Sequence, residues 1–146
     1  MTAENFISAT GRQQIIDAIK NAEANTSGEI RVHIENHCSE EVLDRAAHIF
    51  EKLQIHKTEK RNGVLFYLAV KDHKFAILGD AGINAVTPDG FWNSIKDSVL
   101  QKFARQEFAE GLSIGITLAG EALKKYFPYM SNDVNELTDE ISFGKN

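Results

Sequence analysis

The pattern of apolar and polar positions predicts three strands in the first half of the chain. Residues 29–35 alternate between apolar and polar side chains, which is typical of a half-buried strand. Residues 64–70 are apolar throughout and rich in strand-forming side chains, so we expect a strand that is covered on both faces at the centre of a sheet. Only residues 71–74 separate it from the apolar segment 75–78, and so short a connection predicts an antiparallel hairpin.

Four helices are predicted around these strands. The first covers residues 8–25, where apolar side chains recur on one face. The second begins at Ser39, a good N-cap, and places Leu43 on its apolar stripe. The third begins at Thr87-Pro88-Asp89, which combines a capping hydroxyl, a proline at the first helical position and an acid in the first turn. The last begins near Phe108 and ends near Pro128, and its three glycines predict close packing against a neighbour.

The order of these elements predicts an α/β domain with a small mixed sheet. The first two strands are joined by a helix, and such a crossover favours parallel strands, whereas the hairpin adds an antiparallel third strand. We expect one domain over residues 1–128. The acidic tail over residues 129–146 is expected to form one short helix or to stay loose.

Composition and charge limit the kinds of molecule that this protein is expected to bind. The chain has 146 residues and a formal net charge of −5, with 16 basic and 21 acidic residues scattered along it. Nucleic acid requires a basic stripe, so we expect no nucleic-acid binding and favour a cationic partner. No apolar run is long enough for a membrane span, which predicts no membrane insertion. The single cysteine, Cys38, and the absence of a secretory signal predict a cytoplasmic protein.

Oxygen-bearing side chains are predicted to meet at one end of the sheet. If the first two strands are parallel, their starts lie together, and the hairpin returns the end of the third strand to the same place. Carboxylates, amide oxygens and backbone carbonyls beside glycines are the ligands of hard cations such as Ca²⁺ or Mg²⁺, so this end predicts a site for a divalent metal ion or for a phosphate-bearing ligand. The five predicted ligands are Glu29, Asn62, Asp80, Asn84 and Asp89.

Each predicted ligand also has a structural interpretation. Asp89 suits the first turn of a helix. Asp80 and Asn84 suit turns, and Asn62 can simply end a loop. A second metal site is conceivable at His33, His37 and Cys38, but these three ligands lack a fourth for zinc. We find no phosphate loop and no serine nucleophile-elbow motif.

Four short segments resemble the TPM domain, the thylakoid-lumen-phosphatase-like domain. Residues 61–68, RNGVLFYL, resemble its "DNGVLLLV" stretch, and residues 77–89 resemble its glycine-bearing segment that ends in Pro-Asp. Residues 27–30 look like its "TGAEI" opening, and residues 108–112 look like the entry to its last helix. The likeness spans about residues 10 to 127.

The resemblance implies a three-layer α/β/α sandwich around a small mixed β-sheet. It also implies divalent-cation binding, often of calcium, and for plant members acid phosphatase activity and a role in photosystem repair, a role that we do not transfer to this chain. By matching position, Glu29, Asn62 and Asp89 carry over as ligands. The chain departs from the family at Asp80, where glycine is common, and at Asn84, where glutamate is common.

Two functions follow from the sequence. The first is a divalent-cation-binding TPM-like domain that acts as a regulatory or assembly module, with a protein partner in addition to the metal. The alternative is a metal-dependent acid phosphatase acting on phosphomonoesters, in which the cation polarises a phosphoryl oxygen and Asp80 or Glu29 serves as general base. We favour the first because the sequence shows no recognisable nucleophile and no metal set rich in His and Asp.

Overall fold

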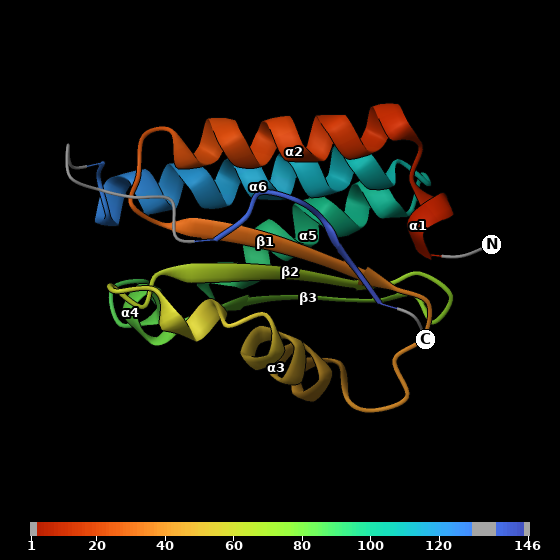
Figure 1. Ribbon diagram of the computed structural model, residues 1–146, viewed down its shortest axis with the longest axis horizontal. Coiled ribbons are helices and arrows are strands. Elements are labelled where there is room, and N and C mark those ends of the chain that lie inside the picture. Colours follow the sequence, from red (N-terminus) through yellow and green to blue (C-terminus); the bar gives the residue numbers. More distant parts are fainter. Residues whose placement is uncertain (1–2, 130–136, 145–146) are drawn as a thin grey trace.

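The computed structural model describes residues 3–129 and 137–144 of the chain, without the side chains of Glu4 and Asn5. Its elements lie in three layers, with α2, α5 and α6 on one face of a central sheet and α3 on the other (Figure 1). The α/β/α sandwich is therefore present. The elements are α1 (Ala3–Phe6), α2 (Ala9–Glu23), β1 (Glu29–Glu35), α3 (Val42–Lys52), the 3₁₀ turn η1 (Ile55–Lys57), β2 (Gly63–Ala69), β3 (Lys74–Gly79), α4 (Ala81–Asn84), α5 (Phe91–Phe103), α6 (Phe108–Tyr126) and β4 (Ser142–Phe143).

The sheet has the strand order β3-β2-β1-β4. β1 runs parallel to β2, with Glu29 opposite Gly63, and β2 runs antiparallel to β3, with Val64 opposite Gly79. These pairings confirm the predicted strand directions and the central place of the second strand. The starts of β1 and β2 and the end of β3 therefore lie at one end of the sheet.

Two apolar cores lie on the two faces of the sheet. The core under α2 and α6 takes Ile30, Val32 and Ile34 from β1, whereas the smaller core under α3 takes Leu65 and Tyr67 from β2. The alternation of side chains along each strand accounts for this division. The predicted tight packing of α6 is confirmed: a Cβ at its glycine positions would collide with α2, α5 or β2.

The polar side of β1 differs from the prediction of a half-buried strand, because every residue of this strand is buried. Residues 137–144 cross this side and pair with β1 through the short strand β4 (Figure 1). The predicted short helix or loose tail is thus replaced, over the described residues 137–144, by an extended segment on the sheet edge. The rest of the predicted tail, residues 130–136 and 145–146, lies outside the described residues.

Helix boundaries differ from the predictions at two places. α3 is capped by Glu41, whose carboxylate accepts from the Asp44 N–H, and Leu43 is exposed, so the buried stripe is shifted from the predicted one. α5 begins after Gly90 rather than at Thr87, whose hydroxyl instead donates to the carbonyl of Ile83 at 3.0 Å. The short helix α4 was not predicted, and its presence moves the start of α5 along the chain.

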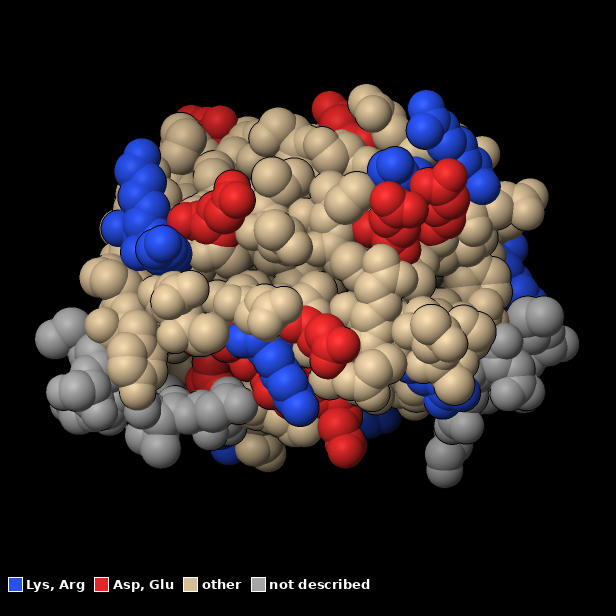
Figure 2. All heavy atoms as spheres, turned by 90° about the horizontal axis from the view of Figure 1, so that it is seen from above, with Lys and Arg blue, Asp and Glu red and all other residues tan. Residues whose placement is uncertain are grey.

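The upper helical face carries its charges in small separated groups. Figure 2 shows acidic and basic side chains side by side on this face, with uncharged surface between them and without a continuous basic stripe among the described residues drawn in it. No helix in the described part of the chain has the length and apolarity needed to cross a membrane.

Candidate functional site

The end of the sheet that carries the predicted ligands is built from three adjacent strands. Glu29 is paired with Gly63 across the β1–β2 ladder, and the Asp80 N–H donates to the Gly63 carbonyl at 2.9 Å. Glu29, Gly63 and Asp80 therefore form one row across the sheet. The backbones that bear two of the five predicted ligands meet as the sequence predicts.

The side chains in this row are separated by a residue of η1. Ile55 packs directly on Gly63, where its Cγ2 would lie 2.5 Å from an added Cβ, so it fills the space between Glu29 and Asp80. The backbones of Glu29 and Asp80 are two strand spacings apart, about 10 Å. Glu29 is 2% exposed and accepts the N–H of Leu137, in the segment that crosses β1.

The two predicted amides are engaged elsewhere. Asn62 is buried and its Nδ2 donates to Ser27 at 3.2 Å. Asn84 donates through Nδ2 to the carbonyl of Gly79 at 2.8 Å and accepts from the Trp92 indole at 3.0 Å. Both amides thus hold loops and helices in place around the strand ends.

Asp80 forms an ion pair with two hydrogen bonds at this end. Its carboxylate is 6% exposed, takes two bonds of 2.7 Å from the guanidinium of Arg61, and caps α4 by accepting the Ala81 N–H. Hydrogen bonds and charge from Asp80 raise the pKa of Arg61. Arg61 has a left-handed backbone with φ of 52° and stands where the TPM stretch quoted above has aspartate. Compared with the family pattern, this chain therefore has both an additional acid, Asp80, and an additional base, Arg61, and the two neutralise each other.

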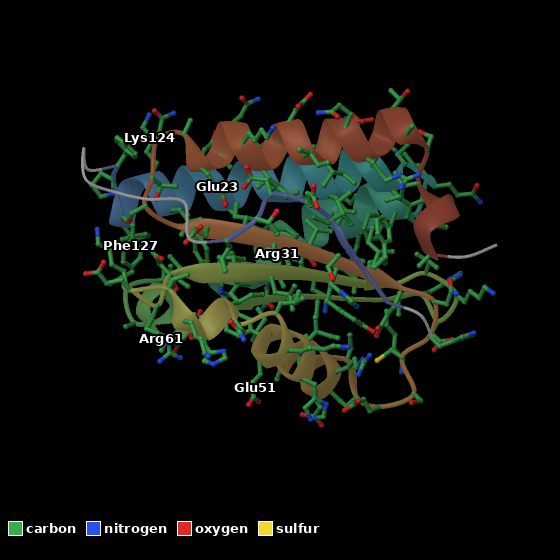
Figure 3. All side chains as sticks on the ribbon, viewed as in Figure 1. Glu23, Arg31, Glu51, Arg61, Lys124 and Phe127 are labelled. Atoms are coloured by element: carbon green, nitrogen blue, oxygen red, sulfur yellow. The ribbon has the colours of Figure 1, made fainter. Side chains whose placement is uncertain are left out.

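A cavity of about 410 Å³ opens beside Asp80, and Glu51, His56 and Arg61 also line it. Figure 3 shows Glu51 and Arg61 on the α3 side of the sheet. As they stand, no three His, Cys, Asp or Glu side chains within the described residues are arranged to hold a metal ion. Asp89, the fifth predicted ligand, is exposed in the loop before α5.

A second group of acids, which the sequence did not reveal, lies under the crossing segment. Glu23, at the end of α2, accepts the Ile30 N–H through Oε2 at 2.8 Å, while its Oε1 and the Oδ1 of Asp139 are buried without a hydrogen-bond donor. Burial, followed by the hydrogen bond with Asp139, raises the pKa of Glu23 to about 9. A proton shared by the two carboxyl groups would satisfy both oxygens. Figure 3 shows Glu23 close above β1, where Arg31 is found.

We expect Glu23→Gln to stabilise the protein at alkaline pH. A raised carboxyl pKa means that folding takes up a proton above the usual pKa of 4.5, so stability falls as pH rises from 4.5 towards 9. Glutamine keeps a donor for Asp139 and an acceptor for Ile30 without this cost. After allowance for partial exposure, the gain should be about 1–2 kcal/mol at pH 8.5 and close to zero at pH 4.5.

Urea unfolding of the two proteins at both pH values measures this difference. Glu121→Gln, at an exposed position of α6, is the matched control and should keep the pH dependence of the wild type. A Glu23→Gln variant that is less stable at pH 8.5 would contradict the shared proton.

A third polar group lies at the far end of β1. Glu35 is fully buried and accepts two bonds from Arg45, at 2.8 and 2.9 Å, one from the Tyr67 hydroxyl and one from His33 Nε2 at 3.2 Å. Burial alone would raise the pKa of Glu35, but these hydrogen bonds outweigh it and hold the pKa at about 2. His33 in turn contacts the hydroxyl of Ser142 at 2.9 Å.

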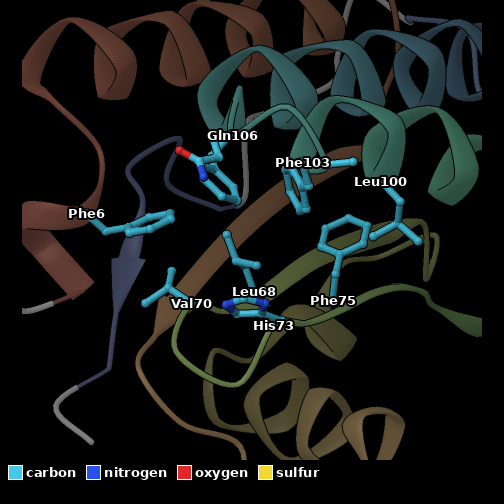
Figure 4. A pocket seen from close by; sticks show the side chains of 10 residues that line it. Phe6, Leu68, Val70, His73, Phe75, Leu100, Phe103 and Gln106 are labelled. Atoms are coloured by element: carbon cyan, nitrogen blue, oxygen red, sulfur yellow. The ribbon is translucent and has the colours of Figure 1, made fainter.

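The far end of the molecule also holds an apolar cavity of about 570 Å³, between α1, the β2–β3 hairpin and the turn from α5 to α6. Figure 4 shows the rings of Phe6, Phe75 and Phe103 around it, with His73 and Gln106 as its polar members. His73 and Gln106 both have left-handed backbones, with φ of 53° and 62°. This cavity is separate from the strand-start end that carries the predicted ligands.

Comparisons with known proteins identify the family. The model of the TPM domain matches residues 1–122. The NMR structure of the BA42 protein from the psychrophilic bacterium Bizionia argentinensis is 46% identical, with a TM-score of 0.89 over 95% of this chain and 96% of that one. A comparison with curated proteins gave no match.

Two more distant solved structures share the fold. The N-terminal domain of a P. gingivalis protein has a TM-score of 0.67 at 18% identity, over 84% of this chain and 79% of that one. The N-terminal domain of the cg2496 protein from Corynebacterium glutamicum has a TM-score of 0.64 at 14% identity, over 80% and 74%. With the family match over most of its length, this chain belongs to the TPM domain family.

Proposed function

We propose that this TPM domain binds a divalent cation, Ca²⁺ in preference to Mg²⁺, at the strand-start end of the sheet, and that it acts as a regulatory or assembly module. The observation that carries the proposal is Asp80, an almost fully buried carboxylate that borders a cavity shared with Glu51. Buried carboxylates require a compensating positive charge, and two carboxylates beside a cavity suit a hard cation. The acidic net charge of −5 agrees with a cationic ligand.

Arg61 is the competitor of the cation in this proposal. Its guanidinium now neutralises Asp80, but its side chain is 50% exposed and can move into solvent when a doubly charged ion takes its place. Glu29, Asn62 and Asn84 would have to leave their present partners to join the coordination, whereas Asp80 already borders the cavity and has only Arg61 to release. We therefore assign Asp80 as the anchoring ligand and the other four predicted residues as secondary ones.

The proposal predicts that Ca²⁺ raises the melting temperature, and that Asp80 and Arg61 determine this rise. At a hundredfold excess of Ca²⁺ over its Kd, binding to the folded state adds about 2.7 kcal/mol, which raises Tm by roughly 5–10 °C relative to EDTA. Asp80→Asn, which keeps a helix-capping oxygen, should abolish the rise. Arg61→Gln should produce the rise at lower Ca²⁺, because the carboxylate no longer has a competing cation.

Thermal melts in CaCl₂, MgCl₂ and EDTA test this, with Asp97→Asn on the exposed side of α5 as the control. An Arg61→Gln protein that responds less to Ca²⁺ than the wild type would show that Arg61 does not compete for the site. Equal melting temperatures with and without every divalent cation would remove the proposal altogether.

The cavity beside Asp80 also gives specific support to the phosphatase alternative. His56 and Arg61 line it, and a guanidinium displaced from Asp80 would be placed to bind a phosphoryl group. Turnover of p-nitrophenyl phosphate that needs a divalent cation and is lost in Arg61→Gln would establish this activity. A Tm rise without such turnover would favour the binding module.

A further inference from the structure

A chain of hydrogen bonds joins a serine, a histidine and a glutamate at the end of the sheet opposite to the proposed cation site. Ser142 of β4 is the register partner of His33 in β1, and its Oγ lies 2.9 Å from His33 Nδ1. The other ring nitrogen, Nε2, lies 3.2 Å from Oε1 of Glu35. His33 and Glu35 share one face of β1 because they are two residues apart.

The hydrogen-bond partners of Glu35 determine which ring nitrogen of His33 carries a hydrogen. Its two oxygens accept from the Arg45 guanidinium and the Tyr67 hydroxyl, so the carboxylate is ionised and can only accept. His33 Nε2 must then carry a hydrogen, which leaves the lone pair of Nδ1 facing Ser142. The Ser142 hydroxyl donates to that lone pair, and the result is the order of nucleophile, base and orienting acid found in serine hydrolases.

The same three residues border a cavity in which a substrate can be placed. The cavity has a volume of about 350 Å³ and is also lined by Arg45, Lys52 and Gly144. Burial is the main cause that lowers the pKa of His33, and the charges of Arg45 and Lys52 add to it. The hydrogen bond and charge of Glu35 raise the pKa but do not outweigh burial, so the imidazole is neutral and able to act as a base at neutral pH. Lys52 also lines this cavity and brings a positive charge to it.

Gly144 allows the crossing segment to lie this close. A Cβ at this position would come within 2.7 Å of Glu35 and 3.2 Å of His33 Nε2. The Gly144 N–H donates to the carbonyl of Ile34 at 2.9 Å, so main-chain bonding holds Ser142 beside His33 independently of the serine side chain.

We propose that Ser142 is the nucleophile of an acyl-transfer site that hydrolyses esters of small acyl groups, with His33 as general base and Glu35 as a positioning residue. Ser142 Oγ bonds to the ester carbonyl carbon while its proton passes to His33 Nδ1. The bond from that carbon to the alcohol oxygen then breaks, and His33 returns the proton to the leaving alcohol. Water, deprotonated by His33, attacks the acyl-serine, the bond to Oγ breaks, Ser142 regains a proton, and a carboxylic acid is released.

The site differs in kind and place from the proposed cation site. Ser142 lies beyond residues 1–122, the part matched by the TPM domain, so this activity would be a property added to the domain by its C-terminal segment. It needs no metal ion, and EDTA should leave it unchanged. Loss of ester hydrolysis in EDTA would move the chemistry to the cation site and overturn the assignment.

The full-length protein can be tested with p-nitrophenyl acetate and with a fluorophosphonate probe. We expect one probe molecule per chain, mapped to the peptide that contains Ser142, and a fall in hydrolysis of roughly a hundredfold or more in Ser142→Ala. Ser94→Ala, an exposed serine of α5 that bonds its own helix backbone, should react like the wild type. An unchanged rate in a folded Ser142→Ala protein, or labelling of another residue, would overturn the proposal.

The roles of His33 and Glu35 are tested by the pH profile. The wild-type rate should rise with the deprotonation of one group whose pKa lies below 6.5, and this limb should be absent in His33→Gln. In Glu35→Asp, which keeps the carboxylate but shortens it, the limb should remain with a reduced rate. A wild-type profile that lacks the limb would exclude His33 as the base.

Discussion

Replacing Glu35 with glutamine is expected to lower the free energy of unfolding by about 3–5 kcal/mol at pH 7. The fully buried carboxylate accepts hydrogen bonds from Arg45, Tyr67 and His33, and a neutral amide cannot satisfy all three donors. The amide hydrogens would also point at the Arg45 guanidinium. Because the Arg45 side chain is 29% exposed and can turn partly to water, we expect a loss nearer to the lower limit.

The same carboxylate should make stability fall in acid. A pKa of about 2 in the folded protein, below the usual 4.5, means that the stabilisation is complete above pH 4.5 and is lost as pH falls towards 2. The difference corresponds to roughly 3 kcal/mol. Urea unfolding between pH 2 and 7 should therefore show a shallower acid limb in Glu35→Gln than in the wild type.

Glu40→Gln is the matched control for this variant. Glu40 Oε1 lies 3.3 Å from His48 Nδ1, but both side chains are exposed, so the loss of this contact should cost at most about 0.5 kcal/mol. If Glu35→Gln were no more destabilising than Glu40→Gln, the hydrogen bonds described for the buried carboxylate would not exist in solution.

The sequence predicted the sheet better than the helix boundaries. The apolar run at 64–70 and the polar link at 71–74 leave few alternatives to a central strand followed by a hairpin, and the structure has both. Helix starts depend on competing caps. Glu41 supplies the capping oxygen of α3 in place of Ser39, and the unpredicted α4 takes up the residues before Thr87, so helix signals at those two positions were misleading.

The polar face of β1 shows where sequence patterns reach their limit. Alternation in residues 29–35 correctly indicates a strand with two different faces, but it does not reveal what covers the polar one. The cover comes from residues 137–144, more than a hundred positions away, and, at Glu35, from Arg45 of α3. The alternating pattern therefore predicts solvent exposure for Arg31, His33 and Glu35, although all three are buried in the fold.

The candidate cation site was predictable in position but not in detail. Strand directions alone bring Glu29 and Asp80 into one row. The direction of each side chain depends on contacts that have no sequence pattern, such as Ile55 packing on Gly63 and Arg61 pairing with Asp80. The Ser142–His33 contact likewise could not be predicted, because nothing in the sequence shows that the two residues are neighbours.

Gly82→Ala is expected to destabilise the protein by about 3 kcal/mol, at the upper end of the range for overpacking. A Cβ at this position would lie 2.1 Å from the carbonyl oxygen of Lys60 and 2.6 Å from that of Arg61. Both obstacles are main-chain atoms, so no side-chain rotation can relieve the collision. The Gly82 N–H also donates to Arg61 O at 2.7 Å, and this bond must lengthen or break.

Comparison of Gly82→Ala with Gly90→Ala separates the stability cost of a steric collision from the cost of a left-handed backbone. Gly90 has a φ of 74°, but an added Cβ would meet only Asn93 Nδ2 at 3.5 Å, so its substitution should cost about 1 kcal/mol from conformation alone. Urea unfolding of both variants at pH 7 provides the comparison. If Gly82→Ala costs no more than Gly90→Ala, then α4 is not packed against the loop before β2. The larger loss would instead show that α4 packs closely on the main chain of Lys60 and Arg61, the residue whose side chain pairs with Asp80.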